Sequence, residues 1–188
     1  VFRSQVRFIG AGTIGVAAIW SLVKLVGPVA KGIADTMRAG AAAKTGAHDD
    51  RDMPMGAIAL LSFVCLLAIG TLLYLFIQGA PTLQPYTWPL VFGGVAFTVI
   101  VGAFIATVAG YMAGLIGASN SPVSGIGILS IVIGSLLLAA FAQPVLGEGA
   151  TDALVAFALF AVAMVFSIAT ISNDNLQDLK TGQLVGAS

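Results

Sequence analysis

The stretch Gly117-Ala118-Ser119-Asn120-Ser121-Pro122-Val123-Ser124-Gly125 decides how this chain is divided, because it is polar, carries no charge and separates two long apolar runs, residues 90–116 and 123–142. Ser121 is a favourable helix N-cap, and Pro122 suits the first helical position, where no backbone N–H donor is needed. We therefore expect a helix to begin here, with the positive end of its dipole facing the polar residues. Within a membrane this arrangement would bind an anion such as a carboxylate, whereas at the membrane surface it would be a tight turn. The sequence leaves both alternatives open.

The composition of the chain excludes a water-soluble protein. Hydrophobic residues make up 59% of the sequence, charged residues only 9%, and the mean hydropathy is +1.04. Soluble domains carry about 25% charged residues. Apolar runs close to the ~20 residues that cross a bilayer as a helix recur, and the alternating ~10-residue patterns of an outer-membrane barrel are absent. We expect an all-α, polytopic integral membrane protein with about five transmembrane helices, at residues 8–26, 55–78, 90–116, 123–142 and 153–171.

The charge balance and the cysteine content exclude further classes. Eight basic and eight acidic residues leave no net charge, so the sequence shows no footprint for nucleic acid. Cys65 is the only cysteine, which excludes an intrachain disulfide and a cysteine-based zinc site. We expect neither a metal site nor a cofactor.

The most polar stretch of the first half lies at residues 35–53. It holds His48 beside three aspartates, but no second histidine supports a metal site, so we interpret it as a solvated loop. Together with Lys31 it carries four basic residues, the largest such cluster in the chain. The positive-inside rule then predicts that this loop is cytoplasmic, with the N-terminus outside and the C-terminus inside.

Small residues recur at every fourth position along the third expected span. They are Gly102, Ala106, Gly110 and Gly114. Residues four apart lie on one face of a helix, and small side chains let a neighbouring backbone approach closely. We expect this helix to pack inside a bundle through that face.

The fifth expected span is followed by the polar segment Asn173-Asp174-Asn175-Leu176-Gln177-Asp178-Leu179-Lys180-Thr181-Gly182. Asp174 and Asp178 are four residues apart and share a face if the helix continues. Two neighbouring carboxylates repel each other, which favours proton binding by one of them, and Lys180 could neutralise a carboxylate. The alternative is a solvated cytoplasmic connector that ends at Gly182.

Taken together, the 119–125 stretch and the 173–182 segment resemble the oligopeptide transporter family, which includes the yellow-stripe-like metal-chelate transporters of plants. The segments Phe8-Ile9-Gly10-Ala11-Gly12 and Arg51-Asp52-Met53-Pro54 point to its bacterial branch. The resemblance covers nearly the whole chain and is most specific at Asp-Leu-Lys-Thr-Gly, residues 178–182. It implies a secondary transporter driven by protons, whose cargo ranges from short peptides to metal chelates. Family members are considerably longer, so we expect this chain to be an internal fragment of a larger helical bundle.

The resemblance, with the polar break between two spans, also suggests roles for individual residues. Cargo contacts are expected from Ser119, Asn120, Ser121, Pro122, Ser124, Asn175 and Gln177, and proton coupling from Asp174, Asp178 and Lys180. The expected partners are membrane lipid, the remainder of the transporter chain, protons and a small peptide or metal-chelate substrate. The expected location is the bacterial inner membrane.

Two other classes of function are open to a chain of this kind. A structural or assembly subunit of a membrane complex would associate through the small-residue face of the third span. A membrane-embedded enzyme lacks support, because no nucleophile with a base, no paired histidines and no phosphate loop in context is present. Gly10, Gly12 and Gly15 match G-x-G-x-x-G, but no strand–helix–strand pattern follows them. Flux across reconstituted vesicles would separate the transporter from both alternatives.

Overall fold

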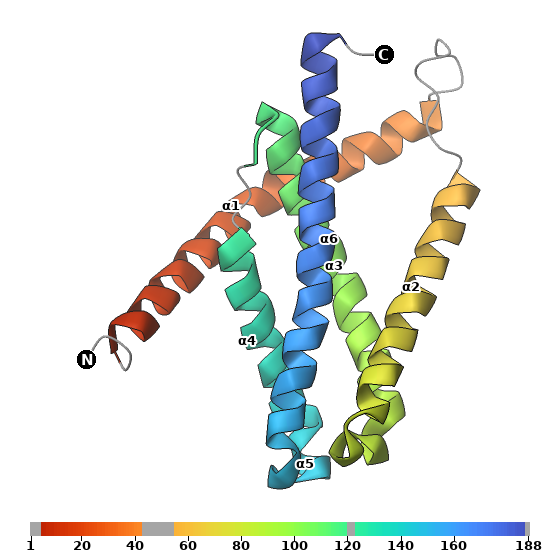
Figure 1. Ribbon diagram of the computed structural model, residues 1–188. Coiled ribbons are helices and arrows are strands. Elements are labelled where there is room, and N and C mark those ends of the chain that lie inside the picture. Colours follow the sequence, from red (N-terminus) through yellow and green to blue (C-terminus); the bar gives the residue numbers. More distant parts are fainter. Residues whose placement is uncertain (1–4, 43–54, 120–122, 187–188) are drawn as a thin grey trace.

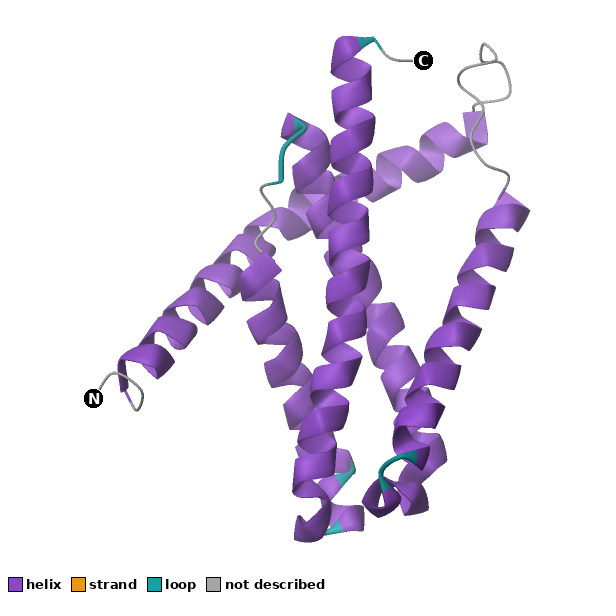
Figure 2. Ribbon diagram, in the orientation of Figure 1, coloured by secondary structure: helices purple, strands orange, loops and turns teal. Residues whose placement is uncertain are grey.

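The computed structural model describes residues 5–42, 55–119 and 123–186. Within these ranges every regular element is a helix (Figure 2), so the predicted all-helical class is confirmed. The α-helices are α1 (Arg7–Ala42), α2 (Met55–Gln78), α3 (Thr87–Ile116), α4 (Val123–Phe141), α5 (Gln143–Leu146) and α6 (Thr151–Val185). Two short 3₁₀ helices, η3 (Pro81–Tyr86) and η4 (Glu148–Ala150), connect α2 to α3 and α5 to α6.

Helix α6 lies at the centre of the bundle (Figure 1). Helix α3 packs along it more extensively than any other helix, and α4 packs on it as well. Helix α2 contacts mainly α3 and η3, while α1 crosses the others obliquely and rests on α4 and α3. The directions of α2, α3, α4 and α6 alternate, which places the end of α3 and the end of α6 on the same side of the bundle (Figure 1).

The helices have the length and composition of membrane spans. In the described part of the chain, three helical stretches are long and apolar enough to cross a bilayer: Gly56–Gln78, Pro81–Leu115 and Glu148–Val185. Two shorter apolar helices, Phe8–Ala17 and Gly125–Phe141, accompany them. The chain is therefore a polytopic helical membrane protein.

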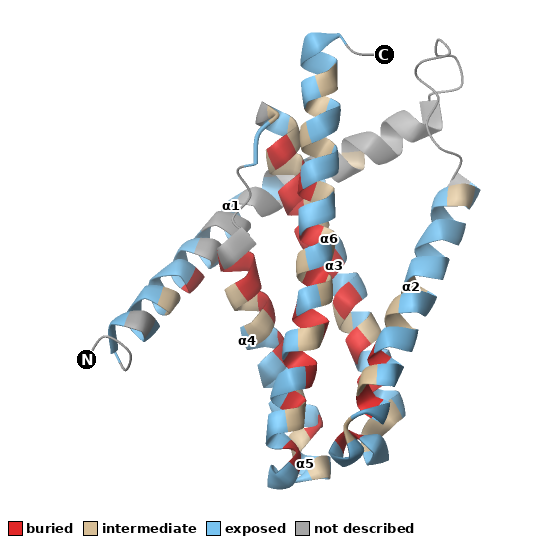
Figure 3. Ribbon diagram, in the orientation of Figure 1, coloured by how far each residue is buried: buried red, intermediate tan, exposed pale blue. Residues whose placement is uncertain are grey.

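The outward faces of the bundle are apolar, as a lipid environment requires. Figure 3 shows exposed residues along almost the whole of α2, and exposed large hydrophobic residues also lie on α3 and α4, such as Ile100 and Leu136. Only 11% of the apolar span of α2 is buried, so nearly its whole surface is open to lipid or to other helices. At the η3 end, the ring of Trp88 stacks on Tyr74 and on Phe92, with ring centroids 6.0 Å and 5.9 Å apart.

Three boundaries differ from the sequence prediction. Helix α1 continues to Ala42, into the stretch that we expected to be a loop, because this segment is rich in alanine, the strongest helix former. Residues 81–86 form a 3₁₀ helix rather than an open turn, and α3 begins at Thr87, because Pro89 falls in its first turn, where no N–H donor is needed. Helix α6 runs through Gly182 to Val185, since a single glycine costs a helix only about 1 kcal/mol.

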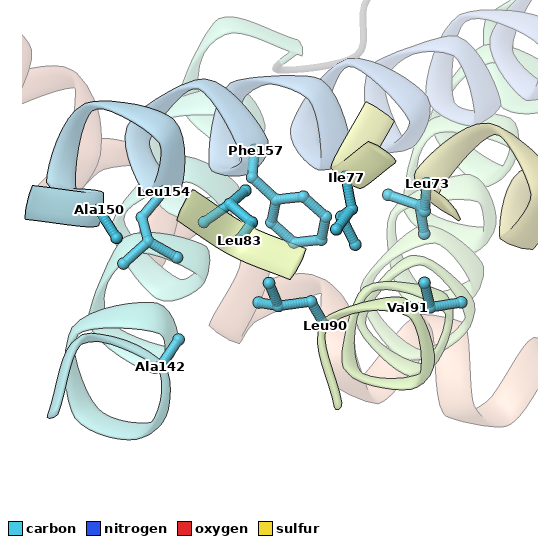
Figure 4. Packing of buried hydrophobic residues seen from close by; sticks show 9 residues of the cluster. All are labelled: Leu73, Ile77, Leu83, Leu90, Val91, Ala142, Ala150, Leu154 and Phe157. Carbon is cyan, nitrogen blue, oxygen red and sulfur yellow. The ribbon is translucent and has the colours of Figure 1, made fainter. Parts of the chain in front are cut away.

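The core consists of two apolar clusters along the central helix. The larger one lies at the η3 and α5 end, where side chains from α2, η3, α3 and α6 meet (Figure 4). Its buried members are Leu73, Ile77, Leu83, Leu90, Val91, Ala142, Ala150, Leu154 and Phe157. The smaller cluster joins α3, α4 and α6 through Ile105, Ile126, Val165 and Ala169. These clusters fix α3, α4 and α6 relative to one another.

Candidate functional site

The interface between α3 and α6 is built on the small-residue face of α3. A Cβ added at Gly110 would lie 2.7 Å from Ser172 Oγ and 3.3 Å from Leu176 Cγ, so no side chain fits there without movement. The hydroxyl of Ser172 donates to the carbonyl oxygen of Ala106 at 2.7 Å. A direct bond from a side chain of one helix to the backbone of another requires such a close approach.

The same face continues above and below this contact. A Cβ added at Gly102 would lie 3.0 Å from Ile168 Cδ1, and one at Gly114 would lie 3.6 Å from Leu176 Cδ1. The small residues that the sequence places on one face of α3 therefore all lie against α6. Their spacing fixes the register between the two helices, and with it the part of α6 that faces the end of α3.

Helix α3 ends at a glycine, and the chain then turns back along α6. Gly117 has φ of 67°, a conformation that favours glycine, and its N–H donates to Ala113 O at 2.9 Å. A Cβ at Gly117 would lie 3.4 Å from Lys180 Cγ, whereas Ser119, only two residues later, hydrogen-bonds to Asn173. Lys180 lies about two turns beyond Asn173 on α6, and helical side chains lean back towards the start of their helix. The turn therefore descends towards the centre of the bundle, by no more than the roughly 7 Å that two residues can span.

The lengths of the two flanking helices agree with this descent. Helix α3 has 30 residues and α4 has 19, which correspond to about 45 Å and about 28 Å. Figure 1 shows α4 beginning well below the ends of α3 and α6. The polar stretch thus connects the outer end of one helix to the deeper start of the next.

Asn173 joins the polar stretch to the polar segment of α6. Its side chain is buried, with 3% of the residue exposed. Its Nδ2 group donates to Ser119 Oγ at 3.2 Å and to Asp174 Oδ1 at 3.2 Å. A buried amide has to be hydrogen-bonded, so these contacts hold Ser119 against α6. The two polar segments that are 54 residues apart in sequence therefore meet at one point.

The two aspartates predicted to couple protons lie on a continuous helix. Because α6 extends past both, Asp174 and Asp178 are one turn apart and share a face, and both are exposed. Among the described residues, the ammonium of Lys180 donates to Gln183 Oε1 at 3.0 Å and to neither aspartate. The side chain of Lys180 lies against the end of α3 and reaches towards Gln183, and the neutralisation of a carboxylate by Lys180 stays a prediction.

The remaining predicted cargo residues are placed as follows. Asn175 is exposed on α6 and Gln177 is half-buried, with its backbone carbonyl accepting a hydrogen bond from Thr181 Oγ1 at 2.9 Å. Ser124 lies in the first turn of α4. The predicted residues Asn120, Ser121 and Pro122 lie outside the described residues, and so does the proposed N-cap.

The described side chains form no cluster suited to a metal ion. No group of three or more histidine, cysteine, aspartate or glutamate residues comes together within the described ranges. His48 and the neighbouring aspartates fall in residues 43–54, which are outside these ranges. The chemistry of the site is thus hydrogen bonding by neutral amides and hydroxyls, next to exposed carboxylates.

Comparison with known proteins places the chain in a family. The model of the family described as "OPT oligopeptide transporter protein" matches residues 1–188. The chain belongs to the oligopeptide transporter family. A protein of Haemophilus influenzae with the name "Putative oligopeptide transporter" is 38% identical over 195 residues, which cover 100% of this chain and 30% of that protein. No solved structure gives a significant match.

Membership of the oligopeptide transporter family gives the described contacts a functional setting. The chain spans about 30% of the length of its Haemophilus relative. Within this part, the contact between the descending turn and α6 is a polar junction in a largely apolar structure. Polar groups inside a membrane protein are costly and mark functional positions.

Sequence reasoning missed one residue of this junction. Asn173 begins the polar segment of α6, but only residues after it were predicted to belong to the site, because their side chains carry a charge or an amide group. Its position in the helix could have revealed it. Asn173 lies seven residues after Phe166 and four after Ala169, which is fully buried, so it continues a buried face into the polar segment.

A second feature, an apolar cavity, lies near the opposite end of the bundle. Its volume is about 410 Å³, and it lies between α3, α4 and α6. Aromatic side chains from all three helices line it, together with glycines such as Gly94 and Gly134. It holds few polar groups and is separated along α6 from the junction at Asn173.

Proposed function

We propose that this chain forms part of a proton-coupled secondary transporter that moves short peptides or peptide-like metal chelates across the bacterial inner membrane. Family membership supports a transporter, and the observation that carries the proposal is the contact between Ser119 and Asn173. This contact joins the uncharged polar stretch to the acidic segment of α6. The contact supports the proposal because coupled transport requires the cargo-binding residues and the proton-binding residues to lie next to each other.

The residues have distinct roles in this proposal. The stretch from Ser119 to Ser124 contacts the cargo, with Asn120 offering both donors and an acceptor and with the first turn of α4 facing a peptide or chelate carboxylate. Asn175 and Gln177 add amide contacts from α6. Asp174 and Asp178, one turn apart and open to solvent, bind and release the proton, and Lys180 supplies positive charge to the same end of the helix.

The descent of the turn along α6 favours a site within the bundle over a turn at its surface. Transporters commonly bind substrate where a helix is interrupted and a half-helix N-terminus points at an anionic group. Here α4 starts deeper than α3 ends (Figure 1), and the chain between them is polar and uncharged. We infer that the start of α4 is the anion-binding element.

Uptake by reconstituted protein tests this function. The transporter is placed in liposomes with an inward proton gradient, and uptake of labelled short peptides of different lengths is measured. We expect uptake in the wild type, its loss in Asn120→Leu, and unchanged uptake in the control Gln143→Leu, which makes the same kind of change in α5 at the far end of the bundle. Equal amounts of protein in the liposomes exclude an insertion defect.

Two results would contradict the proposal at different points. If Asn120→Leu transports as well as wild type, the polar stretch is not the cargo site. If Asp174→Asn combined with Asp178→Asn keeps full stimulation by the proton gradient, these carboxylates do not carry the proton. Absence of peptide and chelate flux in the wild type would favour a structural subunit instead.

A further inference from the structure

Asn173 forms a side-chain hydrogen bond between the acidic segment of α6 and the turn that follows α3. It is buried, whereas its neighbour Asp174 is exposed. One nitrogen, Nδ2, lies 3.2 Å from Ser119 Oγ and 3.2 Å from Asp174 Oδ1. The same amide group therefore contacts both a residue of the turn and a carboxylate.

Hydrogen-bond chemistry determines which atom of the Asn173 amide faces the carboxylate of Asp174. An ionised carboxylate only accepts hydrogen bonds, and the amide nitrogen of asparagine carries two N–H donors. One donor can serve Asp174 and the other Ser119. A hydrogen bond to a carboxylate is about twice as strong as one to a neutral acceptor, so loss of the charge weakens the bond to Asp174, which helps to orient the amide.

We propose that Asn173 is a positioning residue that links the charge state of Asp174 to the position of the turn at Ser119. When Asp174 is ionised, its carboxylate holds the amide in the orientation that binds Ser119. When Asp174 is neutral, this restraint weakens and the turn becomes freer to move. The inference rests on the proposed function, because it assigns to Asn173 the connection between the proton-binding residue and the cargo-binding stretch.

Few other ionisable groups surround this connection. On α6, Asp178 lies one turn further, and Lys180 donates to Gln183. Among the described helices that pack along α6, α4 carries no ionisable side chain and α3 carries only Tyr111. The charge of Asp174 is therefore the largest local change that protonation can make next to Asn173.

Hydrogen exchange of the full-length transporter tests the connection without any cargo. The exchange of the backbone amides of residues 117–119 is followed by mass spectrometry in the wild type, in Asp174→Asn, in Asn173→Ser and in the double variant. Asparagine at position 174 mimics the neutral acid, and serine at position 173 retains only one donor. Thr170→Val, which removes an exposed hydroxyl one turn earlier on α6, serves as the control.

We expect Asp174→Asn to accelerate exchange at these amides by about threefold or more in the wild-type background, and to have no further effect once Asn173 is replaced. Thr170→Val should leave exchange unchanged. The inference is overturned if Asp174→Asn does not alter exchange, or if it accelerates exchange equally with serine at position 173. Asn173→Leu, which keeps the branched shape of asparagine without its donors, replaces the serine variant if that variant does not fold.

A second measurement separates this inference from the proposed function. In liposomes, the KM for labelled trialanine is measured as a function of external pH. We expect Asn173→Ser to flatten the pH dependence as Asp174→Asn does, while transport at saturating peptide persists. A wild-type pH dependence in Asn173→Ser contradicts the inference alone. If no peptide is transported, the proposed function fails, and the exchange experiment still decides the role of Asn173.

Discussion

Replacement of Gly110 by alanine should separate α3 from α6. The new Cβ would lie 2.7 Å from Ser172 Oγ, and this hydroxyl is held by its bond to Ala106 O. Displacing the hydroxyl forfeits a hydrogen bond worth about 0.5–1.5 kcal/mol, and overpacking of a close interface costs about 1–3 kcal/mol. The gain from replacing glycine within a helix offsets about 1 kcal/mol. We therefore expect a net destabilisation of about 0.5–3.5 kcal/mol.

A matched series on the same helix isolates the steric effect. Gly114→Ala places its Cβ 3.6 Å from Leu176 Cδ1, an ordinary contact, so it should be neutral or stabilising by up to about 1 kcal/mol. Unfolding of the purified protein in detergent, followed by intrinsic fluorescence over a denaturant series, gives the difference between the two variants. Ser172→Ala removes the atom that the new Cβ strikes and should relieve most of the penalty of Gly110→Ala.

Two outcomes would refute this reasoning. Equal stability of Gly110→Ala and Gly114→Ala would mean that α3 and α6 do not approach closely at Gly110. An unchanged penalty for Gly110→Ala in the Ser172→Ala background would mean that the hydroxyl is not the obstacle. In either case the register that places Ser119 beside Asn173 would lose its support.

Two further predictions concern α4. The ring of Phe166 occupies the space that a Cβ at Gly127 would need, so Gly127→Ala should lower stability by about 1–3 kcal/mol. A Cβ at Gly134 has Phe97 Cζ as its nearest neighbour, at 3.5 Å, so Gly134→Ala should not lower stability. Equal effects of the two variants in the detergent unfolding assay would contradict the described contact of α4 with α6. The hydroxyl of Ser130 is buried and has no hydrogen-bond partner among the described residues. Ser130→Ala should therefore be neutral or raise stability by about 1 kcal/mol. A loss of stability in the same assay would show that the hydroxyl has a hydrogen-bond partner.

The sequence predicted the helical class and the family because both depend on local patterns. Apolar runs near the length of a membrane span indicate helices regardless of how they pack. The spacing of Gly102, Ala106, Gly110 and Gly114 indicated a packed face, since residues four apart share one side of a helix. The sequence did not identify the helix that packs against this face, because small residues allow any helix to approach closely.

The site was harder to predict because it depends on register and on chain direction. Gly117 indicates the end of a helix, but the sequence around it does not reveal that the chain turns back along α6 instead of leaving the bundle. The continuation of α6 through Gly182 was also missed, because a glycine in a polar segment usually indicates a cap. Asn173 was overlooked because it was interpreted as the start of a polar segment and not as the continuation of the helix face that includes Ala169.

The small-residue face of α3 and the polar junction are therefore parts of one arrangement. Because Gly110 admits Ser172 and Leu176 so closely, α3 and α6 are fixed in one register, and the end of α3 meets α6 near Lys180. The left-handed turn at Gly117 then directs the chain back along α6, which brings Ser119 to Asn173 rather than to the more distal residues of α6. A shift of α3 along α6 by one turn would place a different α6 side chain opposite Ser119, near Ala169 in one direction and near Gln177 in the other. Packing variants on α3 should consequently alter the behaviour of the turn even though none of them touches it.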